Sequence, residues 1–340
     1  MVIMRKYLNI LIILSISATA LFQPAQAQNR KLAQTGMKFL SVSTDARASA
    51  LSGAMTAVEG NSTALFYNPA GMADMNHTLH MSAGQVKWLA DINYLFGSAA
   101  YSPAMGQYGI FAISLLAVDY GEFYNTILAN NEQGFLELDS FYPTAYAFGI
   151  GYAKSLTNKF RIGGHIKYVQ QNLGGGVVEF ASDQSAVTRS FSADILAFDF
   201  GLIYRTGFKS LNFGMNIRNF SQEIEYVKDS FQLPLLFEMG LSMNLFDLTR
   251  FEGGAHDLIL AIDATHPRDY EEQLDLGLEY VFQQTVALRV GYTTPSDEQG
   301  VSFGAGFRQA MGTTGLAIDY CFTPFGVFEN VHRFSFQFYF

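Results

Sequence analysis

The sequence predicts an all-β membrane protein: a 14-stranded antiparallel transmembrane β-barrel with a short helical N-terminal hatch in its lumen. Three observations indicate this fold. Charged residues make up only 15% of the chain, while 31 Gly, 31 Phe and 18 Tyr favour strands and turns. Segments of about ten residues with alternating apolar and polar side chains recur from residue 78 onward. No stretch after residue 25 has the roughly 20 unbroken apolar residues of a membrane helix.

We interpret residues 1–27 as a secretory signal peptide. Arg5 and Lys6 precede an apolar run, and Ala25–Ala27 fit a small-x-small cleavage site, so the mature chain is expected to begin at Gln28. An uncleaved membrane anchor is the alternative, but the apolar run is short for a spanning helix. Without Arg5 and Lys6, the 21 basic residues become 19 against 30 acidic ones, a net charge of −11. This charge argues against nucleic acid as a partner.

The barrel is expected over residues 78–340. The predicted strands are 78–88, 91–101, 107–118, 141–155, 159–172, 193–205, 208–218, 233–245, 256–266, 273–282, 285–293, 300–308, 314–322 and 331–340. An even number of strands of this length is typical of single-chain outer-membrane barrels. A large soluble β-sandwich also alternates, but its outer face carries many charges. Here the polar faces are rich in Gly and Ala, as expected for a crowded lumen.

The lengths of the connections support the barrel independently. The long connections 119–140, 173–192 and 219–232 are the third, fifth and seventh, whereas even connections such as 156–158 are tight. The medium-length even connection 246–255 is the exception. Long outer loops with short periplasmic turns are the pattern of outer-membrane barrels, and a soluble sandwich has no reason to sort its loops in this way.

The last strand ends on the C-terminal residue and has phenylalanine at every second position. We expect these side chains to face lipid and to form the signal that directs barrel assembly; they are Phe334, Phe336, Phe338 and Phe340. The strand is expected to pair with the first one, which removes both edges.

Residues 28–77 do not alternate, and we expect them to form the hatch. Asp45 is placed to cap a helix that ends near Gly53, and Asn61 or Ser62 to cap a turn through Phe66. A 14-stranded lumen is too wide to be filled by wall side chains alone, so a small, apolar segment of this length is expected inside it. A periplasmic extension outside the barrel is the alternative.

The stretch Lys38–Ala73 resembles the N-terminal signature of the PorV/PorQ family, a branch of the FadL-like 14-stranded outer-membrane barrels. The residues of the predicted hatch motif are Asp45, Arg47, Gly53, Asn68, Pro69, Ala70 and Gly71. Leu51-Ser52-Gly53 departs mildly from the Leu-Gly-Gly that is usual there. The resemblance implies a location in the bacterial outer membrane and no enzymatic activity.

The resemblance implies two functions of different classes. PorV-type proteins serve type IX secretion and bind the C-terminal signal domain of exported cargo, with other secretion components as partners. FadL-type relatives take up hydrophobic small molecules. The predicted outer loops favour the first function because aromatic side chains lie among acidic ones there; those residues are Phe123, Tyr124, Phe135, Tyr226 and Phe231. The same residues would equally suit an aromatic girdle at the membrane rim.

Other chemistry is not indicated. The six His form no ligand set, so we expect no metal site and no cofactor, and no nucleophile–base pattern or catalytic residue is readable. Gly174–Gly176 lack a P-loop lysine and are interpreted as a flexible loop. The predicted lumen carries charges of both signs, which should pair with one another and with the hatch; they are Arg161, Lys167, Asp199, Arg218, Asp263, Asp275, Glu279, Arg289, Arg308, Asp319 and Arg333. Arg47 is the expected partner of a wall carboxylate.

Overall fold

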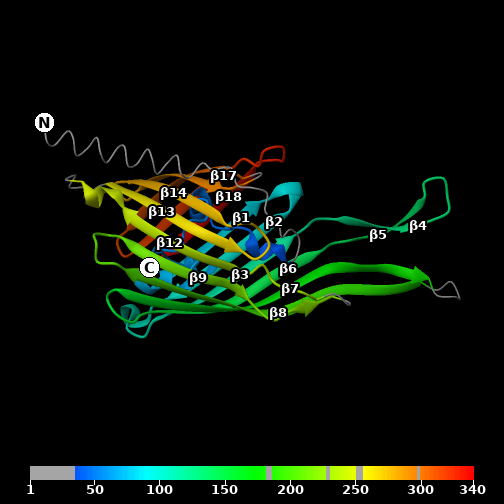
Figure 1. Ribbon diagram of the computed structural model, residues 1–340, viewed down its shortest axis with the longest axis horizontal. Helices are drawn as coiled ribbons and strands as arrows, with labels where there is room; N and C mark the ends of the chain where they lie inside the picture. Colours follow the sequence, from blue (N-terminus) through cyan, green and yellow to red (C-terminus); the bar gives the residue numbers. More distant parts are fainter. Residues whose placement is uncertain (1–34, 181–185, 227–229, 250–255, 297–298) are drawn as a thin grey trace.

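The computed structural model describes residues 35–180, 186–226, 230–249, 256–296 and 299–340. Within these residues, fourteen antiparallel strands close into one barrel, in which each strand pairs with its neighbours along the chain and the last pairs with the first (Figure 1). The predicted signal peptide lies outside the described residues. No helix in the described part of the chain is long and apolar enough to cross a membrane.

The fourteen barrel strands correspond one to one to the predicted segments, which confirms the predicted fold class. They are β1 (Leu79–Lys87), β2 (Asn93–Tyr101), β3 (Ile110–Asp119), β6 (Thr144–Ser155), β7 (Phe160–Phe180), β8 (Ala186–Arg205), β9 (Asn212–Phe220), β12 (Leu236–Asn244), β13 (His256–Pro267), β14 (Gln273–Phe282), β15 (Val286–Thr294), β16 (Val301–Met311), β17 (Thr314–Thr323) and β18 (Val331–Tyr339).

Barrel closure rests on the pairing of β1 with β18. Their register runs from His80 opposite Tyr339 to Lys87 opposite His332. The C-terminal residue extends this ladder, because the Leu79 and Phe340 backbones exchange two hydrogen bonds of 3.0 and 2.9 Å. No edge of the barrel sheet is left open, and large apolar side chains such as Leu95, Leu115 and Phe336 are exposed on its outer face.

The barrel has two unlike ends. At one end, which we call the arm end, the connections after β1, β3, β7, β9, β13, β15 and β17 gather; at the other, the turn end, lie the shorter connections and Phe340. The predicted loops 119–140 and 173–192 contain strands instead. The first holds the hairpin of β4 (Phe123–Leu128) and β5 (Phe135–Phe141), which extends one residue beyond the predicted loop. In the second, β7 and β8 continue to pair beyond the barrel. Both hairpins project away from the barrel in Figure 1.

The interpretation of Gly174–Gly176 as a flexible loop is therefore wrong. Gly175 and Gly176 pair with Ser190 and Arg189 of β8, after a register shift that follows Asn172. Cross-strand hydrogen bonding outweighs the low strand propensity of glycine here. The third long connection forms a smaller hairpin of β10 (Ile224–Glu225) and β11 (Ser230–Phe231).

The N-terminal segment, residues 35–77, lies inside the barrel, where the blue helices run among the strands in Figure 1. It contains η1 (Lys38–Ser41), α2 (Ala46–Ala50), η2 (Ser62–Phe66) and η3 (Pro69–Asp74). Three more short helices lie in barrel connections: η4 (Leu89–Asp91), η5 (Pro103–Gly106) and η6 (Leu245–Leu248). The segment enters at the arm end and leaves at the turn end, so the core of the molecule is the contact between this segment and the wall.

Candidate functional site

The first turn of the segment is fixed by the expected cap. The Asp45 side chain accepts a hydrogen bond of 3.2 Å from the Ala48 backbone, and this starts α2. Burial raises the pKa of the Asp45 carboxyl. Arg47 lies in the first turn of this helix, two residues after Asp45. Its side chain reaches the wall, where it donates to Glu279 at 2.8 and 3.0 Å. Arg47 thus has the wall carboxylate that the sequence predicted.

The pair of Arg47 and Glu279 belongs to a longer chain of charges. Glu279 also accepts from Arg289 at 2.6 Å, and Arg289 donates to Asp319 at 2.6 Å. Asp319 in turn accepts from Gln337 on β18 at 3.0 Å. Each charge in this buried row has an opposite partner, which offsets the cost of removing it from water.

Glycines of the wall leave room for the backbone of the segment. A Cβ on Gly163 would lie 2.4 Å from the Ala70 nitrogen, and one on Gly201 would overlap the Asn68 side chain. Inward-facing glycines on β9, β14, β15 and β16 are covered in the same way by Thr56, Leu51, Ser52 and Ala50. The segment therefore fits the wall at backbone contact, without a layer of side chains between them.

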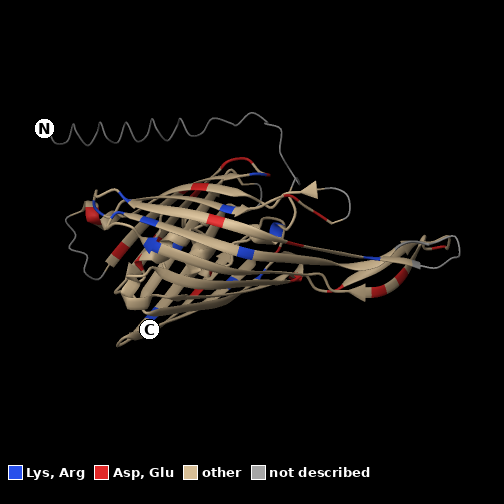
Figure 2. Cartoon of the chain, turned by 90° about the horizontal axis from the view of Figure 1, so that it is seen from below, with Lys and Arg blue, Asp and Glu red and all other residues tan. Residues whose placement is uncertain are grey.

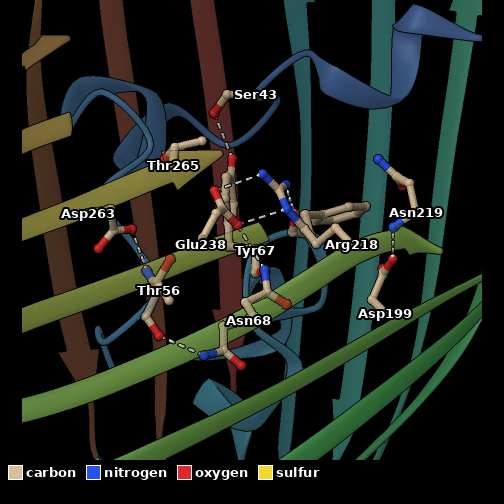
Figure 3. Close-up of polar contacts among 12 residues, drawn as sticks. Ser43, Thr56, Tyr67, Asn68, Asp199, Arg218, Asn219, Glu238, Asp263 and Thr265 are labelled. Atoms are coloured by element: carbon tan, nitrogen blue, oxygen red, sulfur yellow. Dashed lines mark hydrogen bonds and ion pairs between the residues drawn. The ribbon is translucent and has the colours of Figure 1, made fainter. Parts of the chain in front are cut away.

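Asn68 organises the turn that Pro69 imposes. Its side chain accepts from the Ala70 nitrogen at 3.0 Å and donates to the Thr56 carbonyl at 2.6 Å, as Figure 3 shows for the second contact. It also donates to the Leu202 carbonyl of the wall at 3.1 Å. This turn is the start of η3, with Pro69 in its first turn where proline is tolerated. Asn68 supplies the partners that the backbone needs.

At the turn end the segment is held by a cluster of charges that we call the clamp: Glu59, Asp74, Arg161 and Arg205. Arg205 bonds Glu59 at 2.6 Å and Asp74 at 2.5 Å, while Arg161 contacts Glu59 and lies 2.8 Å from Asp74. Burial alone would raise the pKa of Glu59, but the two guanidinium groups outweigh it and hold that pKa below its usual value.

Above the segment, a cavity of about 900 Å³ opens at the arm end, and we call it the vestibule. Its floor is formed by Ser49, Ser52 and Gly53 of the segment, and its sides by the strand ends of the wall. Seven aromatic residues line it: Phe39, Tyr67, Trp88, Tyr94, Tyr120, Tyr270 and Phe325. Charged residues line it as well, among them the pair of Arg218 and Glu238 that Figure 3 shows beside Tyr67.

The loop after β9 closes over the beginning of the segment. Thr35 forms a parallel bridge with Gln232, and the Phe231 ring lies against Gly36. Tyr226 stacks on Phe231 with ring centroids 5.1 Å apart. Both predicted loop aromatics are therefore half-buried at the mouth of the vestibule rather than free on the surface.

The other predicted loop aromatics lie on the β4–β5 hairpin, which we call the arm. Phe123, Tyr124 and Phe135 are all exposed, with Tyr124 at 70%. Residues 119–143 contain five acidic residues and no lysine or arginine, and acidic positions follow the projecting hairpins in Figure 2. The arm thus offers aromatic side chains in a negative field.

The terminal phenylalanines are placed as expected. Phe334, Phe336, Phe338 and Phe340 are all exposed on the outer face, between 39% and 56%. The residues that alternate with them along the strand, such as Arg333 and Ser335, are buried in the lumen.

One hydrogen-bonded chain was not readable from the sequence. Ser114 lies 2.9 Å from His165 Nε2, and His165 Nδ1 lies 3.0 Å from Asp199. Asp199 also accepts from Lys167 and from the Asn219 backbone, the latter drawn in Figure 3. The adjoining cavity of about 30 Å³ has room for one or two water molecules, so a substrate carbonyl has no access to Ser114. This row of hydrogen-bonded side chains includes Asp199, which lies where the pairing of β8 with β9 shifts register.

The sequence predicted the Asp45 cap, the wall partner of Arg47 and the pairing of Arg161 with the segment, but it did not predict the rest of the clamp or the vestibule. The sequence did contain a signal for the close contact between the segment and the wall. It is the glycines at inward-facing positions of the wall strands, such as Gly277 and Gly291. No comparable pattern marks the clamp, because its members come from distant turns. In the described residues, no group of three or more His, Cys, Asp or Glu is arranged to hold a metal ion.

Comparison with known proteins gives a family match and a fold match. The profile of the family "Type IX secretion system membrane protein PorP/SprF" matches residues 122–338, nearly two thirds of the chain. The segment 38–73, which carries the PorV/PorQ resemblance, lies outside that match. None of the curated proteins compared with the chain matches it significantly.

Among solved structures, the Pseudomonas putida toluene transporter TodX is similar with a TM-score of 0.57 at 12% identity, over 91% of this chain and 98% of that one. The CymD monoaromatic hydrocarbon channel has a TM-score of 0.53 at 13% identity, over 87% and 97%. A Pseudomonas aeruginosa FadL homologue has 0.50 at 11%, over 87% and 98%. At these identities the similarity shows the fold alone: a FadL-like outer-membrane barrel.

Proposed function

The chain belongs to the PorP/SprF family of type IX secretion system membrane proteins, and on this premise we propose that it binds the C-terminal signal domain of exported proteins at the cell surface. This is the role that the resemblance of Lys38–Ala73 to PorV/PorQ implies. The N-terminal segment acts as a static hatch in this proposal. The outer loops and the vestibule receive the partner.

The observation that carries the proposal is the contrast between the two ends of the barrel. The lumen holds a segment whose backbone contacts Gly163, whose Asn68 side chain contacts Gly201, and which is tied to the wall through Glu279. The arm end instead projects exposed aromatic residues, including Phe123 and Tyr124. Exposed aromatic side chains next to charged ones are typical of protein-binding surfaces, whereas a filled lumen offers no continuous path for a solute.

The alternative function is uptake of hydrophobic small molecules, by analogy with the toluene transporter TodX and the monoaromatic hydrocarbon channel CymD. Such a ligand requires a mainly apolar pocket. The vestibule carries the buried carboxylate of Asp275, which forms no ion pair with the described residues and which an apolar ligand would leave without water. This lining favours a polypeptide over a hydrocarbon.

Deletion of the gene tests the proposal. We expect loss of exported proteins from the cell surface, measured by mass spectrometry of the surface and medium fractions, with normal uptake of a radiolabelled hydrophobic nutrient such as toluene. Normal export together with lost uptake would overturn the proposal and favour the transporter.

A further inference from the structure

The charges that line the vestibule are mostly compensated inside the protein. Lys38 lies 2.7 Å from Asp269, and Arg218 donates to both oxygens of Glu238 at 3.1 Å. These pairs need no ligand, because each charge already has an opposite partner.

Asp275 differs from these pairs. It is 8% exposed and lines the vestibule, yet among the described residues only two hydroxyl groups donate to its carboxylate, those of Thr265 at 2.9 Å and Thr293 at 2.7 Å. Each oxygen therefore keeps a second lone pair. A buried carboxylate is costly unless a positive charge compensates it.

The surroundings of Asp275 add negative charge. Asp263 lies directly opposite on β13, where its carboxylate accepts from the Thr56 backbone at 2.8 Å, and Glu238 lies on β12 beyond it. The pair of Glu238 and Arg218 is neutral as a unit. In the described part of the chain, neither Asp263 nor Asp275 forms an ion pair, and of the two only Asp275 lines the vestibule.

The rest of the vestibule suits a long cationic side chain. Aromatic rings attract cations over their faces, and the vestibule already contains three such contacts, one of them between Arg218 and Tyr67 at 5.8 Å. Lys38 lies 4.8 Å from the centre of the Tyr270 ring, and the Arg333 guanidinium lies 5.5 Å from the centre of the Trp88 ring. The aliphatic stem of an incoming side chain would pack on such rings while its charge reaches the floor.

We propose that the vestibule binds a cationic side chain, lysine or arginine, of the partner polypeptide, with Asp275 as its counter-ion. The inference rests on the proposed function and names the chemistry of its partner. Half-buried Glu271 at the mouth and the five acids of residues 119–143 would draw a basic segment toward the cavity.

The test uses the purified full-length protein in detergent and a fluorescent peptide, acetyl-Gly-Tyr-Lys-Tyr-Gly-amide, with its Nζ-acetylated twin as the uncharged probe. We expect the lysine peptide to bind about tenfold more tightly or better, as a charged hydrogen bond requires. Equal binding of the two peptides to the unaltered protein would overturn the inference without the need for any variant.

A matched pair of variants locates the site. Asp275→Asn should abolish the preference for the lysine peptide, while Asp263→Asn, which removes a carboxylate opposite it but outside the vestibule lining, should retain it. A preference that survives Asp275→Asn would contradict the assignment. Resistance of each folded barrel to SDS at room temperature verifies that both variants are intact.

The outcome can be separated from that of the proposed function. If the lysine preference is absent but gene deletion still removes exported proteins from the surface, the inference fails and the proposed function stands. If the preference and its loss in Asp275→Asn are found while deletion leaves export normal, the cation site stands and the proposed function fails.

Discussion

Arg47 and Glu279 are joined by two hydrogen bonds across 232 positions of sequence, and the pair fixes the N-terminal segment to the wall of the barrel. Glu279 also holds Arg289, so one carboxylate compensates two buried guanidinium groups. The contact explains why the segment stays inside a lumen that it could otherwise leave. The first prediction concerns this pair.

Glu279→Gln should lower the free energy of unfolding by about 3–5 kcal/mol, because it leaves Arg47 without a buried counter-charge. Urea-induced unfolding in lipid vesicles measures the loss. Glu271→Gln, at the half-buried rim of the vestibule, is the control and should change stability little. Equal effects from the two changes would mean that the pair does not hold the segment.

The contact of the segment with wall glycines gives a second prediction. Gly163→Ala should force the backbone at Pro69 and Ala70 away from the wall at a cost of about 1–3 kcal/mol. Gly164→Ala, one residue along, meets nothing closer than 3.8 Å and should be tolerated. Limited proteolysis of the segment measures the displacement. Similar cutting in the two variants would contradict the close fit.

A sequence can predict this fold because alternation is a local property. Leu276 and Leu278 face outward and Asp275 and Glu279 inward, simply because successive side chains of a strand point to opposite faces. The arm was missed because its pairing depends on a hairpin that begins beyond the membrane belt, where alternation no longer has to match lipid. The interpretation of Gly174–Gly176 as a flexible loop is wrong for the same reason, because these residues pair with β8 beyond the membrane belt.

The candidate site was only partly predictable. Asp45 and Asn68 act on atoms two or three residues away, so their roles follow from local rules. The clamp and the pairing of Asp275 with threonines instead depend on the register between strands and on the path of the segment through the lumen. Neither is encoded in spacing along the chain.

The clamp predicts a dependence on pH. The pKa of Glu59 is held below its ordinary value of 4.5, so its contribution to stability is fully present above pH 4.5 and is lost as the pH falls through the lowered pKa. Urea unfolding between pH 6 and pH 3 should therefore show a loss of stability on acidification that is smaller in Glu59→Gln.

The control for this prediction is Glu137→Gln, an exposed carboxylate on the arm, which does not touch the clamp and should retain the slope of the unaltered protein. An unchanged slope in Glu59→Gln would show that the clamp does not carry the acid sensitivity.

The orientation of the barrel gives a further prediction. A protease site inserted within residues 173–192, in the projecting β7–β8 hairpin, should be cut on intact cells, because the arm end faces outward. The same site inserted at residues 156–158, at the turn end, should be protected. Cleavage only at 156–158 would reverse the orientation and place the vestibule in the periplasm.

The central claim is that the projecting arm, and not movement of the segment, performs the function. The most direct measurement is the amount of exported protein on the cell surface after residues 122–142 are replaced by a short Gly-Ser turn, compared with Asn68→Ala in the segment. We expect surface display to be lost without the arm and nearly intact in Asn68→Ala. Normal display without the arm, with hydrophobic uptake lost in Asn68→Ala, would contradict the claim.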